Sequence, residues 1–160
     1  MPPKYGRQNL KRIVRILKME INDINRKIQK NQANLEILQS EKQRLLSEID
    51  DLDQSRTYIK KRKGEAQERF NNRVIRVTGF AGHNSRGVAG IMSKLENINS
   101  LSAADSHVYK AMQTIEAMLG DIDNAIVKRD DRIAEINQQI GEYGDEIERL
   151  KREKRSMENA

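Results

Sequence analysis

The sequence has no cysteine and no tryptophan, and only two of its 160 residues are proline. Without cysteine the chain cannot form disulfides, use a thiolate nucleophile or build a cysteine-based zinc site. Aromatic residues account for 4% of the chain, whereas 34% of the residues are charged. Because a thick globular core needs more large apolar side chains than this, the composition favours a long and thin helical protein.

Long apolar runs are also missing. The apolar cluster near the N-terminus, IVRIL at 13–17, is interrupted by Arg15 and is too short for the core of a signal peptide. No run in the sequence approaches the length of a membrane-spanning helix. We therefore expect a cytoplasmic protein without membrane insertion, which could be exported without a classical signal peptide as part of a complex.

Apolar residues recur with alternating spacings of four and three along two long segments. A seven-residue repeat of this length is typical of helices that supercoil against another helix. We call these positions the seam. In the first segment they are Leu10, Val14, Leu17, Ile21, Ile24, Ile28, Asn31, Leu35, Leu38, Lys42, Leu45, Ile49, Leu52, Arg56, Ile59, Lys63, Ala66 and Phe70. In the second they are Val108, Met112, Ile115, Leu119, Ile122, Ile126, Arg129, Ile133, Ile136, Ile140, Tyr143, Ile147, Leu150, Lys154 and Met157.

The two segments predict one all-α domain over residues 1–160. We expect a first long helix at 8–70, a glycine-rich connection with a short helix at 71–103, and a second long helix at 104–158. Two helices of similar length fold back most simply as an antiparallel hairpin in which each buries its seam against the other. The glycine-rich connection and its short helix would then form the tip of this helical coiled coil.

Polar residues also occupy seam positions, among them Asn31, Lys42, Arg56, Lys63 and Arg129. Polar side chains in a seam lower stability, but they can fix the alignment of the helices or the choice of partner. We take Asn31, Lys42, Arg56 and Arg129 as candidate specificity residues. Alternatively, the long lysine and arginine stems lie along the seam and keep their charges in water.

Further apolar residues lie outside the seam. They widen the apolar face of both helices beyond what a two-helix hairpin can bury. We therefore expect a helical partner, which is either another protein or a second copy of the chain. These flanking residues are Ile13, Ile16, Ile37, Leu46, Met118, Val127 and Ala134.

The net charge of +6 is concentrated at one end of the sequence. Residues 1–18 contain six basic residues and no acid, so the remaining 142 residues carry 24 basic and 24 acidic groups. These residues could bind an anionic ligand, or they could simply form a solvated helix face. We call them the basic tip: Lys4, Arg7, Lys11, Arg12, Arg15 and Lys18.

Nucleic acid is one possible ligand for the basic tip, because basic segments precede the heptads of DNA-binding zipper proteins. Here, however, the tip contains the seam residues Leu10, Val14 and Leu17, and so it belongs to the heptad pattern. A second basic cluster at Lys60–Lys63 lies far along the first helix. The two clusters could bridge phosphates without sequence specificity, and nucleic acid binding stays an alternative.

The glycine-rich stretch VTGFAGHNSRGVAG at 77–90 lacks the residues of a phosphate-binding loop. Gly82 and Gly87 have the right spacing, but Val88 and Ala89 stand where lysine and serine or threonine are required. The only two histidines are not at metal-ligand spacing, and we find no arrangement typical of a catalytic site. The sequence predicts no enzyme activity, no cofactor and no metal.

Between the two heptad segments, Phe80-Ala81-Gly82 resembles the turn of the WXG-type helical-hairpin proteins of type VII secretion. The longer first and second helices are similar to the elongated members of this family that are associated with LXG-type toxins. The resemblance implies that Phe80 packs against the hairpin end, that Gly82 permits the chain reversal, and that both form a partner-binding turn. Phenylalanine replaces tryptophan here, and the connection is longer than in the family.

The resemblance also implies a function. The family's partners bind the helical N-terminal domain of an LXG-type toxin and help to deliver it to the export machinery. The family's export signal, a tyrosine followed four residues later by an acid, is absent, because Ile147 follows Tyr143 and Gln113 follows Tyr109 at that distance. The expected function is therefore that of a secretion partner or targeting chaperone whose mate carries the signal. A self-assembling structural coiled coil is a further alternative.

Overall fold

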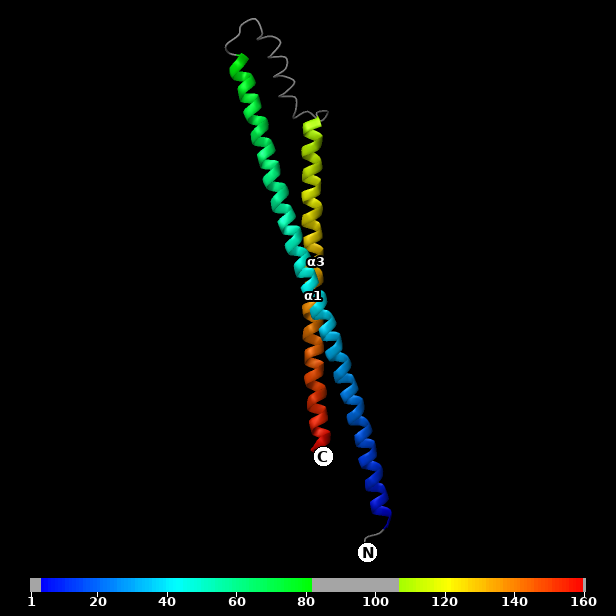
Figure 1. The fold of residues 1–160 in the computed structure, drawn as a ribbon. Helices are drawn as coiled ribbons and strands as arrows, with labels where there is room; N and C mark the ends of the chain where they lie inside the picture. Colours follow the sequence, from blue (N-terminus) through cyan, green and yellow to red (C-terminus); the bar gives the residue numbers. More distant parts are fainter. Residues whose placement is uncertain (1–3, 82–106, 160) are drawn as a thin grey trace. The chain divides into compact units, whose positions relative to one another are not determined.

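A computed structural model describes residues 4–81 and 107–159, with side chains described for residues 6–73 and 109–159. The described residues form two helices, α1 at Lys4–Ala81 and α3 at His107–Glu158 (Figure 1). The described ranges contain no strand. The predicted all-α fold is therefore confirmed for these residues.

The helix boundaries differ from the sequence prediction mainly at the end of the first helix. α1 continues to Ala81, so the expected end at residue 70 is corrected. Residues 71–81 contain no proline, and their β-branched side chains disfavour a helix by only a few tenths of a kcal/mol each, which does not break one. α3 is described from His107 and ends at Glu158 as expected, whereas the expected start at residue 104 lies outside the described residues. The short helix expected within 71–103 falls mostly outside the described residues.

Packing contacts group the chain into two compact units, and the single domain at 1–160 stays a prediction. The first unit contains Met1–Ser47 with Asp130–Ala160, and the second contains Glu48–Arg129. Each unit thus combines a segment of α1 with a segment of α3. This division is natural for two thin helices, because residues far apart along a helix share no contact.

The seam is the buried face of both helices. Within the described side chains, every seam residue from Leu17 to Phe70 except Ala66 is at least half-buried, as is every seam residue from Met112 to Met157. The buried residues all belong to the seam: Ile24, Leu38, Leu45, Leu119, Ile136, Ile147 and Leu150. The seven-residue repeat therefore predicted the core correctly.

Ion pairs show that the helix segments of the second unit run antiparallel. As the residue numbers rise along α1, the partners on α3 fall: Glu48 pairs with Arg129, Arg56 with Asp123, and Lys63 with Glu116. In the first unit, Glu41 of α1 pairs with Arg132 of α3. The predicted hairpin packing of α1 against α3 is thus confirmed within the units.

Candidate interaction surface

A small apolar core holds the two helices of the first unit together. Leu38 and Leu45 of α1 pack with Ile136 of α3, whose side chain is 0% exposed. Three partly buried residues of α3 surround them, namely Ile133, Ile140 and Tyr143. Because each helix contributes only one stripe to this core, its remaining faces stay open to solvent or to a partner.

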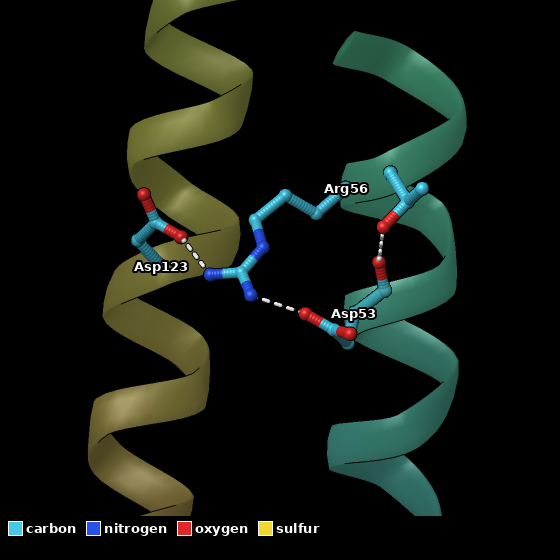
Figure 2. A network of polar contacts seen from close by, with 4 residues as sticks. Asp53, Arg56 and Asp123 are labelled. Atoms are coloured by element: carbon cyan, nitrogen blue, oxygen red, sulfur yellow. Dashed lines mark hydrogen bonds and ion pairs between the residues drawn. The ribbon is translucent and has the colours of Figure 1, made fainter. Parts of the chain in front are cut away.

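Arg56 forms a charged bridge between the two helices of the second unit (Figure 2). Its Nη1 donates to Asp123 Oδ1 on α3 at 2.8 Å, and its Nη2 donates to Asp53 one turn earlier on α1. Hydrogen bonds to Asp123 and then to Asp53 raise the pKa of Arg56 above its ordinary value. A seam arginine thus keeps its charge at the helix interface because two carboxylates lie beside it.

Arg129 and Lys63 make similar contacts in the same unit. Arg129 Nε donates to Glu48 Oε2 at 2.8 Å, and its Nη1 donates to the carbonyl oxygen of Ala125 at 3.0 Å. Lys63 pairs with Glu116. The contacts of Arg56 and Arg129 therefore align α1 with α3 of the same chain. Their expected role in choosing a partner stays a prediction.

The corresponding ion pair of the first unit involves a residue outside the seam. Arg132 donates from Nε to Glu41 Oε1 at 3.0 Å and from Nη2 to Glu41 Oε2 at 3.3 Å. Its Nη1 also donates to Glu135 at 3.0 Å. These hydrogen bonds, first that to Glu41 and then that to Glu135, raise the pKa of Arg132. The two parallel bonds fix the alignment of the helices more strictly than a single contact.

Sequence reasoning identified the charged seam residues but missed the flanking residues that form ion pairs between the helices. Glu41, Glu48 and Arg132 each directly precede a seam residue. Side chains at such flanking positions line the edge of a helix pair and commonly carry complementary charges. A search for opposite charges at these positions in an antiparallel alignment would have found Glu41 and Arg132.

The first unit has an open groove along one edge of the seam, with a volume of about 710 Å³. Asn31, one of the candidate specificity residues, lies in this groove with Asn34, Ile37 and Tyr143. The α1 side of the groove also carries Lys27 and Lys30, and the α3 side carries Glu142 and Glu146. The lining of the groove therefore combines the apolar side chains of Ile37, Leu38 and Tyr143 with positive charges from α1 and negative charges from α3.

Lys42, the remaining candidate specificity residue, lies on the other edge of the seam. It is half-buried and lines a second groove together with Gln39, Asn137 and Ile140. The structure therefore separates the four candidates. Asn31 and Lys42 line different grooves of the first unit, whereas Arg56 and Arg129 form ion pairs in the second.

The flanking apolar residues are exposed, as the sequence predicts. Ile37 is 65% exposed in the first unit and Val127 is 55% exposed in the second. The other members, Ile13, Ile16, Leu46, Met118 and Ala134, are exposed as well. The prediction that apolar side chains outside the seam stay open to solvent within this chain is therefore confirmed.

The N-terminal end of α1 extends past the end of α3, as Figure 1 shows for the blue and red ends of the helices. Arg132 of α3 pairs with Glu41 of α1, and α3 ends at Glu158, 26 residues after Arg132. Because the helices run antiparallel, the residue of α1 opposite Glu158 lies 26 residues before Glu41, which is Arg15. Seam residues before that point therefore lack a partner segment. Exposure falls accordingly from 62% at Leu10 to 5% at Ile24.

The basic tip lies on this extension. Lys4 is the first residue of α1, and the side chains of Arg7, Lys11, Arg12, Arg15 and Lys18 are all exposed. No described residue forms an ion pair with any of these five side chains. Their charges are therefore available to an external ligand.

Phe80 lies in the last turn of α1, and its side chain is outside the described part of the structure. Gly82 and the rest of the connection to residue 106 also lie outside it. Among the side chains that the structure describes, at 6–73 and 109–159, no group of three acidic or histidine residues is arranged to hold a metal. No described helix is long and apolar enough to cross a bilayer.

Comparison with known protein families, curated proteins and solved structures finds no match for this chain. The resemblance to the WXG-type proteins therefore depends on the sequence features alone, and its implications enter as proposals.

Proposed function

We propose that this chain is a non-enzymatic binding protein whose two helices pack against the helices of a partner protein. The observation that carries the proposal is the exposure of apolar side chains outside the seam, with Ile37 as the clearest case. Ile37 lies beside Tyr143 in the groove of the first unit, and so an apolar contact surface continues from the half-buried seam to the exposed flank.

The groove suggests how a partner helix would bind. An amphipathic helix laid along it would place its apolar face on Ile37 and Tyr143. Acidic side chains of the partner would face Lys27 and Lys30, and basic side chains would face Glu142. This order of charges would favour one orientation of the partner over the other, since the reverse orientation brings like charges together.

We further propose that the partner is the helical N-terminal domain of an LXG-type toxin, as the resemblance at Phe80 and Gly82 implies. In this role the chain would co-assemble with the toxin domain before export and act as its targeting chaperone. The absence of a tyrosine-acid export signal from the described helices is compatible with a partner that carries the signal.

Co-expression with an LXG-type toxin domain encoded beside this chain tests the proposal. We expect the two proteins to copurify, and light scattering after gel filtration to give the mass of a complex. The I37Q variant should bind at least about tenfold more weakly, because a buried apolar contact at the centre of an interface commonly contributes more than 1.4 kcal/mol.

The matched control is Q32A, which changes an exposed polar residue of the same helix less than two turns from Ile37. It should bind like the parent. A chain that shows no binding to the toxin domain and instead forms a homo-oligomer of constant mass at all concentrations would contradict the proposal. That result would favour a self-assembling structural coiled coil.

A further inference from the structure

The N-terminal extension of α1 is an amphipathic helix with one apolar and one cationic face. At 3.6 residues per turn, successive side chains are about 100° apart, and Leu10, Ile13, Val14, Ile16 and Leu17 then fall within an arc of about 160°. The six cations of the basic tip fall on the opposite side, within about 140°. Met19 is the one large apolar residue on the cationic side.

Before Arg15 this helix face has no partner within the described chain. Leu10 and Val14 are exposed because α3 ends before it reaches them, whereas Ile13 and Ile16 are exposed because they lie outside the seam. The cations beside them form no described ion pair. Because the first acid of the sequence is Glu20, no negative charge within the segment offsets the basic tip. The extension thus presents apolar surface and unneutralised positive charge together.

The distribution of charge argues against three other occupants. A second copy of the extension would bring twelve positive charges together, six from each chain. A single acidic helix laid on Leu10, Val14 and Leu17 would leave Arg12 and Arg15 pointing away from it. Nucleic acid would neutralise the cations but would leave the apolar arc in water.

We propose that residues 4–19 of α1 bind the surface of an anionic lipid bilayer, with the helix lying in the plane of the interface. The apolar arc would enter the boundary between headgroups and acyl chains, and the lysine and arginine side chains would reach the anionic headgroups. The negative potential of such a surface is spread over the membrane, and so it attracts all six cations. A single acidic helix would attract only the cations along one edge of the extension. This mode does not require the helix to cross the bilayer.

Flotation with phospholipid vesicles tests the proposal on the full chain. We expect the protein to float with vesicles made of about two parts phosphatidylcholine to one part phosphatidylserine, and not with phosphatidylcholine alone. Binding should weaken at least about tenfold when the salt concentration rises from about 0.1 M to about 1 M, because the Debye length shrinks from about 10 Å to about 3 Å.

Two double variants separate the contributions of the two faces. L10Q/I13Q removes apolar surface and keeps every charge, and K11Q/R15Q removes two charges and keeps the apolar arc. Each should lower the partition coefficient at least about tenfold. Both should fold normally, because the extension contributes no fully buried residue to the core, and the helical circular dichroism signal checks this.

The control variant is I37Q, which changes an exposed apolar residue outside the extension. It should weaken binding to the protein partner and leave vesicle binding unchanged. The proposal is overturned if the parent does not float with anionic vesicles, or if L10Q/I13Q floats as well as the parent. It is also overturned if the extension prefers a DNA duplex of about 20 base pairs and L10Q/I13Q binds that duplex undiminished.

Discussion

Arg132 of α3 donates two hydrogen bonds to the carboxylate of Glu41 of α1, at 3.0 and 3.3 Å. The two residues are 91 positions apart in the sequence, so this contact exists only when the helices are aligned as in the first unit. A bidentate pair at the edge of the seam disfavours an alignment shifted by one heptad, because the shift would move both donors of Arg132 away from the Glu41 carboxylate.

Charge reversal tests the contact between Glu41 and Arg132. The single variants E41R and R132E place like charges opposite each other, and each should lower the melting temperature measured by circular dichroism. The double variant E41R/R132E restores opposite charges and should recover most of the loss. If the double variant loses as much melting temperature as the two single variants together, the pair does not help to align the helices.

The buried seam should dominate the stability. I136A removes most of a fully buried side chain from the core of the first unit, and we expect a loss of about 2 to 5 kcal/mol in the free energy of unfolding. I37A truncates the same residue type at an exposed site and should cost less than about 0.5 kcal/mol. Urea denaturation measures both, and equal losses would contradict the assignment of the seam as the core.

Glycine replacements in α3 should stabilise the chain. A Cβ atom built on Gly141 or Gly144 meets nothing within 4 Å, and neither residue has a positive φ angle. Alanine should therefore fit at both positions and add about 1 kcal/mol each, because glycine loses more backbone entropy in a helix. A melting temperature that stays the same or falls in G141A/G144A would show that this part of α3 needs the glycines.

Acid should weaken the C-terminal part of α3. Arg149 donates to Glu146 at 2.8 and 2.6 Å and lowers the pKa of that carboxyl, and Lys151 lowers the pKa of Glu148 in the same way. A lowered folded-state pKa means that the ionised carboxylate stabilises the fold above the unfolded-state pKa of about 4.3. This stabilisation is lost as the pH falls through the folded-state value.

Thermal melts at about pH 7 and about pH 3 measure this effect. Between these two pH values, the melting temperature of the variant E146Q/E148Q should fall less than that of the parent. E36Q changes an exposed glutamate for which the structure gives no ion pair, and it should retain the pH dependence of the parent. The same acid loss in all three proteins would show that other carboxylates cause it.

The sequence by itself determined that the chain forms two long helices and which face of each is buried. Ile24, Leu38 and Ile136 were assigned to the seam from their spacing alone, and all three are buried. This succeeds because a seven-residue repeat is a local pattern, and because a helix brings residues three and four apart onto one face. The end of α1 was placed too early, since weak helix formers at 71–81 lower helix propensity without breaking the helix.

Only the tertiary structure decided which seam residues find a partner. Leu10 and Leu38 follow the same repeat, yet Leu10 is exposed because α3 ends before reaching it. In the same way, Arg56 was visible as a charge in the seam, but its bond to Asp123 depends on how α1 and α3 are aligned. Such alignment is set by contacts between residues far apart in the sequence, and a local repeat carries no information about them.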